Sequence, residues 1–147
     1  SPLHVVRVDL ATGAVTLTEV CGLPNGLIAN PPLVDVERRI VVGFDSSNGV
    51  LAGFDLGDDG TLAPRWQRDQ HHASHLLLFP GTGELVTADH DGARMAEQVV
   101  VLDIDTGDEL ARADTGGPLQ SAVFPAVGWD HDAYLTSFST LTRVSTA

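Results

Sequence analysis

Three glycines stand at a constant spacing of 47 residues, at Gly13, Gly60 and Gly107. Each of them ends a segment that holds an apolar run, an Asp and a short polar gap, within residues 5–13, 51–60 and 99–107. The Asp can accept hydrogen bonds from neighbouring backbone amides while the Gly takes a positive φ, which together make a tight hairpin between two strands. A period of this length predicts a chain built from repeated supersecondary units.

A second set of β-rich runs follows the same period, so that each complete unit contains four strands. Pro or Gly interrupts the chain about every ten residues, and helical periodicity is not sustained, which together indicate an all-β protein. The expected strands are 32–35, 40–45, 50–55 and 61–67 in one unit, and 75–79, 84–89, 97–103 and 108–114 in the next.

One strand is apolar at every position, from Val99 to Leu102. A strand without alternation is typical of a sheet that is covered on both faces, as happens when neighbouring sheets stack. A β-sandwich would also give antiparallel strands and frequent turns, but it does not predict a four-stranded unit at one interval. We therefore expect an all-β fold of four-stranded antiparallel blades of the β-propeller type, with about three repeats of roughly 47 residues.

The turn at residues 102–107 reads Leu-Asp-x-x-Thr-Gly after an apolar strand, and residues 8–13 are close to it. These turns resemble the repeats of quinoprotein-like and related bacterial β-propellers, a resemblance that covers nearly the whole chain. It implies the fold, but such propellers include dehydrogenases, lactonases, lyases, sulfotransferases and non-catalytic platforms. Quinoprotein dehydrogenases also place a Trp after the turn glycine to dock blades. Gly13, Gly60 and Gly107 are interpreted as followed by no such Trp, so pyrroloquinoline quinone is not expected as a cofactor.

The chain is expected to form a single domain over residues 1–147, with blade parts at 3–20, 31–69, 75–114 and 121–145. The first part holds only the last two strands of a blade, and the last part ends after a third strand near Val144. An open arc of this kind leaves apolar faces and strand edges uncovered. Either the chain is a fragment of a longer protein or two copies close a ring, and in both cases we expect self-association.

Twenty acidic residues stand against eight basic ones, which gives a formal net charge of −12. This charge repels a phosphate backbone, so nucleic acid is not an expected partner. No stretch approaches the roughly 20 apolar residues of a membrane-spanning helix, so we expect a soluble protein without a membrane partner. Cys21 is the single cysteine and cannot form an intramolecular disulfide. No signal peptide is visible at the amino end, and the compartment stays open.

Candidate site residues gather in the loops of one blade face. In a propeller blade, the connection between the second and third strands and the connection to the next blade lie on the same face. Imidazole and carboxylate side chains from these loops suit zinc, manganese or iron, and an open metal position could activate water or bind an anion. The alternative is that they hold loops in place and bind no ligand. The candidates are His71, His72, His90, Asp45, Asp89 and Asp91.

Other polar motifs carry less weight. Asp130, His131 and Asp132 belong to the opposite face and are expected to form a solvated turn. The chain has no Gly-x-Ser-x-Gly elbow, and Gly81-Thr82-Gly83 indicates a hairpin rather than a phosphate loop. Both Trp66 and Trp129 are expected to pack in the core.

Three functions are therefore considered. The first is a non-catalytic module that presents its loop face to a protein or small-molecule ligand, because no catalytic motif is complete. The second is a metal-dependent hydrolase or lyase that uses the His and Asp loops. The third is a quinone-dependent oxidoreductase, which the resemblance suggests and the unrecognised docking Trp opposes.

Overall fold

The computed structural model describes residues 1–28, 30–71, 75–117, 124–137 and 139–145, and these residues form strands, turns and loops without a helix. No described segment could therefore cross a bilayer as a long apolar helix. The strands are β1 (His4–Val8), β2 (Val15–Glu19), β3 (Leu33–Asp35), β4 (Ile40–Asp45), β5 (Val50–Leu56), β6 (Leu62–Asp69), β7 (Leu77–Phe79), β8 (Glu84–Asp91), β9 (Ala96–Asp103), β10 (Glu109–Asp114), β11 (Phe124–Val127), β12 (Asp132–Thr136) and β13 (Leu141–Ser145).

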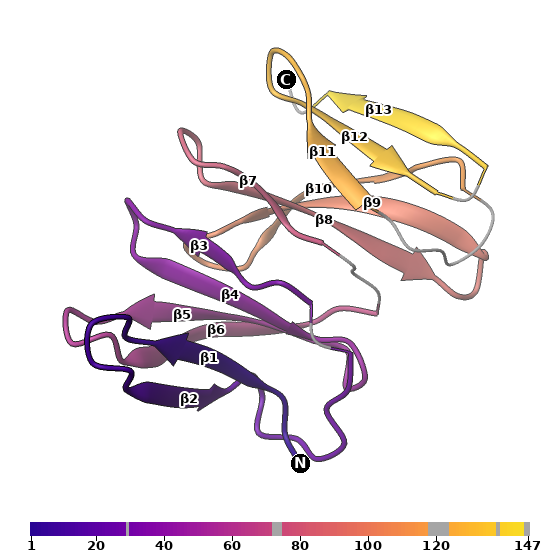
Figure 1. Cartoon of the computed structure of the whole chain (residues 1–147). Coiled ribbons are helices and arrows are strands. Elements are labelled where there is room, and N and C mark those ends of the chain that lie inside the picture. Colours follow the sequence, from indigo (N-terminus) through magenta and orange to yellow (C-terminus); the bar gives the residue numbers. More distant parts are fainter. Residues whose placement is uncertain (29, 72–74, 118–123, 138, 146–147) are drawn as a thin grey trace.

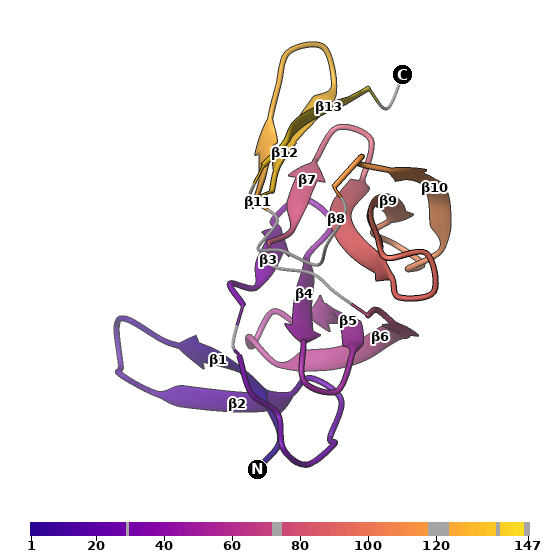
Figure 2. The ribbon, with the colours of Figure 1, turned by 90° about the vertical axis from the view of Figure 1, so that its right-hand side faces the viewer.

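The strands form four antiparallel sheets in which each strand pairs with its neighbour in sequence. We call them sheet 1 (β1–β2), blade 2 (β3–β6), blade 3 (β7–β10) and sheet 4 (β11–β13). Figure 1 shows that they follow one another in chain order, with the two termini at opposite ends of the molecule. The first strands of successive sheets are in contact, β3 with β7 and β7 with β11, along the inner side of the arc (Figure 2). The prediction of an all-β fold with propeller-type blades is confirmed.

The three repeat glycines take the predicted conformation, with φ of 74° at Gly13, 80° at Gly60 and 76° at Gly107. In the outer two turns a single Asp accepts the expected amide hydrogen bonds, since Asp9 Oδ1 lies 2.9 Å from the nitrogens of both residue 11 and residue 12. Asp103 does the same for residues 105 and 106. In blade 2 the position four residues before the glycine is Leu56, where the other two turns have Asp9 and Asp103, and the accepting carboxylate belongs to Asp59 instead of Asp55.

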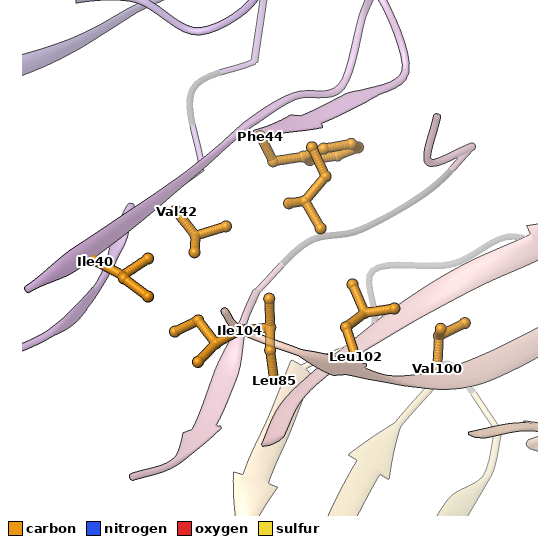
Figure 3. Packing of buried hydrophobic residues seen from close by; sticks show 8 residues of the cluster. Ile40, Val42, Phe44, Leu85, Val100, Leu102 and Ile104 are labelled. Carbon is orange, nitrogen blue, oxygen red and sulfur yellow. The ribbon is translucent and has the colours of Figure 1, made fainter. Parts of the chain in front are cut away.

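The core lies between sheets, in three clusters. The largest lies between blades 2 and 3, where β4 side chains face those of β8 and β9 (Figure 3). The central strand β9 is covered on both faces as predicted, because Val100 and Leu102 join this cluster while Val99 and Val101 pack toward sheet 4. The third cluster, with Val20, Ala52 and Phe54, joins sheet 1 to blade 2. Neighbouring sheets therefore hold each other through apolar contacts rather than through shared strands.

Trp66 joins blades 2 and 3 at their outer rim. Its indole nitrogen donates a hydrogen bond to the carbonyl oxygen of Ile104, at 2.8 Å. Its ring lies so close to Gly107 that a Cβ at that glycine would approach the indole to 2.7 Å. The expectation that no Trp docks on a turn glycine is therefore wrong for this interface. It failed because Arg65 forms a bulge opposite Gly53 and Phe54, which shifts the register of Trp66.

The two terminal sheets leave apolar side chains exposed. In sheet 1, Val6 pairs with Leu17 and Val8 pairs with Val15, so these four residues share the face that points away from blade 2. In sheet 4 the exposed apolar residues are Phe124, Val127, Trp129 and Leu141. The prediction of core packing for Trp129 is therefore wrong, because its side chain stands in solvent at a turn.

Candidate functional site

The predicted site residues lie where blades 2 and 3 turn at one face. Asp45 ends β4, Asp89 to Asp91 end β8, and His71 follows β6. His72 lies outside the described residues. Both strands end in a four-residue turn at this face, 46–49 after β4 and 92–95 after β8.

The connection from blade 2 to blade 3 is tied to both blades. The amide of Gln70 donates to the carbonyl of Gly49, at 2.8 Å, which fixes it to blade 2. The side-chain nitrogen of Gln70 donates to the carbonyl of Ala88 in β8, at 2.5 Å. One residue later the amide of His71 donates to Asp89 Oδ1, at 3.1 Å. Buried side-chain to backbone bonds of this kind fix the position of His71 over blade 3.

A cleft of about 370 Å³ opens beside these residues, and we call it the Arg112 cleft. Its floor is formed by a polar network that starts at the buried carboxylate of Asp89. Arg112 Nη1 donates to Asp89 Oδ2 at 2.9 Å and to Gln98 Oε1 at 2.7 Å. Charge-assisted bonds hold these groups in one geometry. The residues that line the cleft are His71, Asp89, His90, Asp91, Gly92, Gln98 and Arg112.

The outer side of the Arg112 guanidinium is held by Glu109. Arg112 Nε and Nη2 donate to the two carboxylate oxygens of Glu109, at 2.9 and 2.8 Å. Arg68 from blade 2 also reaches this carboxylate, with Nη2 3.1 Å from Oε2. The bidentate pair of Arg112 and Glu109 thus supports the floor of the cleft within blade 3, and the single bond from Arg68 joins it to blade 2.

The pKa values of both carboxyls follow from this network. Burial raises the pKa of Asp89, but the hydrogen bond from Arg112, the amide of His90 and the nearby charges outweigh it, so the pKa falls below its ordinary value. The hydrogen bond from Arg112, aided by Arg68, lowers the pKa of Glu109 to about 2. Both groups are therefore ionised at neutral pH.

The two histidines of the cleft differ in exposure. The side chain of His71 is 77% exposed, and its Nδ1 lies 3.5 Å from Asp89 Oδ1. His90 is largely buried, with Nδ1 3.9 Å from Oε1 of the buried Glu97. His71 is therefore free to reorient toward a ligand, whereas His90 is confined to the wall of the cleft.

Asp45 does not line the Arg112 cleft. It is fully buried in its own turn, where its carboxylate accepts hydrogen bonds from the backbone and side-chain nitrogens of Asn48, at 3.2 and 2.8 Å. The structure therefore brings His71, Asp89, His90 and Asp91 together and leaves Asp45 apart. Among the described residues, no three His, Cys, Asp or Glu side chains are grouped as a metal site requires. Whether the clustered residues bind a ligand stays a prediction.

The sequence analysis missed Arg112 and Gln98, which form the floor of the cleft. One signal was present for Arg112, because Arg65 and Arg112 stand five residues after Gly60 and Gly107 and so occupy the same place in the repeat. No comparable signal marks Gln98. Its role depends on cross-strand neighbours, since Gln98 pairs with Asp89 on one side and with Asp114 on the other.

Every arginine of the chain is paired with a carboxylate. The eight basic residues are all Arg, since the chain has no Lys, and all eight lie in the described part. Each has a carboxylate oxygen within 4.0 Å: Arg7 with Asp9, Arg38 with Asp35 and Asp105, Arg39 with Asp58, Arg65 with Asp55 and Asp105, Arg68 with Glu109, Arg94 with Asp114, Arg112 with Asp89 and Glu109, and Arg143 with Asp132. An anionic ligand would have to compete with these carboxylates, which disfavours the anion-binding version of the sequence hypothesis.

The expectation of a solvated turn at 130–132 holds for Asp130, which is exposed, and is wrong for His131 and Asp132. His131 Nε2 lies 2.9 Å from Glu84 Oε2, and the His131 ring packs on Phe79 with centroids 4.1 Å apart. Asp132 is buried and accepts a hydrogen bond from Arg143 Nε, at 2.6 Å. His131 therefore connects sheet 4 to blade 3, and Asp132 joins two strands within sheet 4, so both have a structural role on the opposite face.

The pH dependence of stability tests the polar network. A carboxyl whose pKa is lowered by folding stabilises the folded state when it is ionised. The contribution of Glu109 should therefore be complete above its ordinary pKa of 4.5 and should be lost as the pH falls toward 2. We expect the free energy of unfolding to decrease over this range, and Arg112→Met to reduce the slope. Urea titrations at a series of pH values measure this, and equal slopes in both proteins would contradict the assignment.

Solved structures with a similar fold include a luciferin-regenerating enzyme, with 17% identity and a TM-score of 0.59 over 97% of this chain and 51% of that one. The β-propeller domain of the Trilobed protease from Pyrococcus furiosus, which has an open velcro topology, shares 10% identity with a TM-score of 0.52. The match covers 96% of this chain and 48% of that one. A candidate 6-phosphogluconolactonase from Bacteroides fragilis shares 11% identity with a TM-score of 0.52, and the match covers 95% of this chain and 48% of that one.

The chain spans about half the length of these proteins. No protein-family model and no curated protein sequence matches it. At such low identity the likeness shows the fold alone. The resemblance to bacterial propeller repeats is therefore confirmed at the level of a β-propeller-type fold.

Proposed function

We propose that this chain is a propeller module that binds a small polar ligand, either neutral or cationic, in the Arg112 cleft. The observation that carries the proposal is the fixed polar floor made by Asp89, Gln98 and Arg112, with His71 and His90 beside it. Ligand sites are typically concave and preformed, with a few polar groups that set the orientation of the ligand. Here the hydrogen bonds within the protein hold the floor before any ligand arrives.

The charge of the cleft sets the class of ligand. Asp89 and Asp91 line it, and Arg112 is its single cation among the described lining residues. That cation is already bonded to Asp89 and Glu109. Hydroxyl groups can exchange hydrogen bonds with such carboxylates and imidazoles, and an amine gains from the negative potential. A carboxylate or phosphate would be repelled by the same potential.

Binding fits the lining residues better than catalysis does. The described residues around the cleft include no Ser, Cys or Lys that could act as a nucleophile. The carboxylate of Asp89 is bonded to Arg112, and that of Asp91 accepts hydrogen bonds from two backbone amides of its turn. The imidazole of His71 is exposed. Turnover of a substrate that disappears in His71→Ala would replace this proposal with an enzymatic one.

Binding can be measured by calorimetry on a panel of neutral polyols, amines and matched carboxylates and phosphates. We expect neutral or cationic members to bind, and His71→Ala to weaken them by about tenfold, since one lost hydrogen bond is worth about 1.4 kcal/mol. His4→Ala is the matched control, because His4 lies in sheet 1 and takes no part in the cleft. Preferential binding of the anions, or equal affinity in His71→Ala, would contradict the proposal.

A metal-dependent hydrolase or lyase is the second candidate. It is favoured by the presence of His71, Asp89, His90 and Asp91 in one cleft, since imidazole and carboxylate are common ligands of zinc and manganese. Two of the similar structures are also named as enzymes. Metal content by mass spectrometry on tag-free protein decides it. Near-stoichiometric metal that is lost in His71→Ala and in His90→Ala would support this function, and a metal-free protein would count against it.

A quinone-dependent oxidoreductase is the third candidate and has the least support. The docking of Trp66 on Gly107 is the kind of blade contact that the resemblance implies. That contact holds two blades together at the rim and says nothing about a cofactor. Pyrroloquinoline quinone is therefore still not expected.

A further inference from the structure

Two asparagines of the chain are followed by glycine. They are Asn25 before Gly26 and Asn48 before Gly49, whereas the remaining Asn30 precedes a proline. The backbone nitrogen of the following residue can attack the carbonyl carbon of an Asn side chain, and glycine hinders this attack least because it has no Cβ. Proline has no N–H with which to react. The sequence therefore offers two sites for spontaneous deamidation, and the fold decides which of them reacts.

The side chain of Asn48 is held in the fold. Its amide nitrogen donates to Oδ2 of the buried Asp45 at 2.8 Å and to the carbonyl of Pro24 at 3.2 Å. The carbonyl of Gly49 accepts the amide of Gln70 at 2.8 Å, so the chain after Asn48 is tied as well. Attack requires the side chain to turn toward the Gly49 nitrogen, which breaks the bonds of the side-chain amide. Asn48 should therefore react only when this part of the protein opens.

The side chain of Asn25 is exposed, and no hydrogen bond to it is found among the described residues. The attacking nitrogen belongs to Gly26, whose N–H donates to the carbonyl of the exposed Ser1 at 3.1 Å. Exposed backbone hydrogen bonds open at a low cost in free energy. The reacting groups of Asn25 and Gly26 therefore have the freedom that those of Asn48 and Gly49 lack.

The fold also requires this Asn–Gly pair. Asn25 has a φ of 63°, a left-handed conformation that Asn adopts more readily than most residues with a side chain. A Cβ at Gly26 would approach the backbone nitrogen of Leu3 to 2.5 Å and its Cβ to 2.8 Å. A larger residue after Asn25 would slow the attack, but it does not fit. The reactive pair is thus a consequence of how the loop between β2 and β3 packs on the start of the chain.

We propose that Asn25 is a site of spontaneous covalent modification, at which deamidation converts the Asn25–Gly26 link to aspartate and isoaspartate. The Gly26 nitrogen forms a bond to Cγ of Asn25 and gives up its proton through solvent to the side-chain amide, which leaves as ammonia. The product is a succinimide ring. Water then adds to one of the two ring carbonyls and opens the ring. Opening at the main-chain carbonyl gives isoaspartate, in which the backbone runs through the side-chain methylene.

Isoaspartate would loosen the connection between sheet 1 and blade 2. The added backbone carbon lies between two bonds that hold the loop on the turn at 46–49. In one, Asn48 donates to the carbonyl of Pro24, and in the other the amide of Leu27 donates to Ser47 Oγ at 3.1 Å. A loop that is longer by one atom cannot keep both bonds in the same positions. We expect hydrogen exchange at the Leu27 amide to become about tenfold faster, which corresponds to the loss of one hydrogen bond.

Mass spectrometry of the folded protein, incubated at mildly alkaline pH and then denatured and digested, measures the reaction at each site. Cleavage after Glu places Asn25 in the peptide 20–37 and Asn48 in the peptide 38–84, and fragment ions locate the mass increase within each. We expect deamidation at Asn25 to be at least about tenfold faster, because two hydrogen bonds hold the amide of Asn48. In urea the two rates should become similar, because the difference comes from the fold.

Three variants test the assignment. Asn25→Gly accepts the positive φ, has no side-chain amide and should abolish the mass increase of the peptide 20–37. Ser47→Ala removes the acceptor of the Leu27 amide and should speed the reaction at Asn25, because the loop opens more easily. Asn25→Asp carries the charge of the aspartate product on an unchanged backbone, so it should leave exchange at the Leu27 amide unchanged.

Several results would overturn the proposal. One is an equal or faster rate at Asn48 in the folded protein. Another is a mass increase of the peptide 20–37 that persists in Asn25→Gly, which would place the reaction at another residue. If Asn25 stayed intact in the folded protein while both sites reacted in urea, the loop would protect Asn25 too. Unchanged exchange at the Leu27 amide in the isoaspartyl protein would overturn the loosening of the loop.

Discussion

Arg112→Met should lower the free energy of unfolding by about 3 kcal/mol, because it removes a partly exposed cation that bonds the buried carboxylate of Asp89. Asp89 is 4% exposed and would keep its charge without the cation. Glu109 would lose both bidentate hydrogen bonds from Arg112 and keep the single bond from Arg68. Methionine retains an apolar stem of similar length, so the decrease in the free energy of unfolding measures the loss of the charged group rather than the loss of packing. Urea denaturation followed by tryptophan fluorescence measures it.

Arg39→Met is the matched control for this substitution. Arg39 also pairs with an Asp, at 3.0 Å, but that partner, Asp58, is 99% exposed. Exposed pairs contribute about 0.2–1 kcal/mol, so the control should change little. The double variant Arg112→Met with Asp89→Asn should recover part of the loss, because it removes the buried negative charge that Arg112 offsets. A loss below about 1 kcal/mol in Arg112→Met would mean that the network does not hold the floor of the cleft.

The second large effect is expected at the rim between blades 2 and 3. Trp66→Ala should cost about 3 kcal/mol, because it removes the indole that covers Gly107 and leaves a void between two blades. Trp66→Phe keeps much of the ring and loses the hydrogen bond to the Ile104 carbonyl, at a cost of about 1 kcal/mol from that bond. Thermal unfolding by circular dichroism measures both variants.

Trp129→Ala is the control, since its side chain is 86% exposed and the substitution should change stability by less than about 0.5 kcal/mol. Gly107→Ala tests the other side of the same contact. It places a Cβ against the indole and also strains a backbone with φ of 76°. If Trp66→Ala proved no worse than Trp129→Ala, the two blades would have to be held together without the docked indole.

The strands and turns could be predicted from the sequence because their causes are local. The 47-residue spacing of Gly13, Gly60 and Gly107 fixes three hairpins, and the apolar run at Val99 to Leu102 identifies a strand with two covered faces. Periodicity and turn chemistry act within about ten residues, which is the range that a single sequence reveals best. The accepting Asp of blade 2 was misplaced by four residues because Leu56 stands at the repeat position that Asp9 and Asp103 hold in the other turns.

The site was predictable only in part, because its contacts join residues from different strands. The turns at 71 and 89–91 could be brought to one face by the topology of a blade, and the structure places them in one cleft. Asp45 belongs to the same kind of turn, but Asn48 binds its carboxylate locally. The hydrogen bond between Arg112 and Asp89 joins residues 23 positions apart, and it depends on the face of β10 from which the Arg112 side chain extends. The bulge at Arg65, which sets the register of Trp66, has no local signal.

The placement of the arginines also determines where trypsin can cleave the folded protein. Trypsin cleaves after Lys or Arg, and this chain offers it Arg alone, in strands or tight turns. A protease must draw a segment of backbone out of the fold before it can cut, so cleavage follows the population of locally opened states. Each of the eight positions thus becomes a reporter of opening in its own sheet, from β1 at Arg7 to β13 at Arg143. The order in which the cuts appear would rank the sheets by how readily each one comes apart.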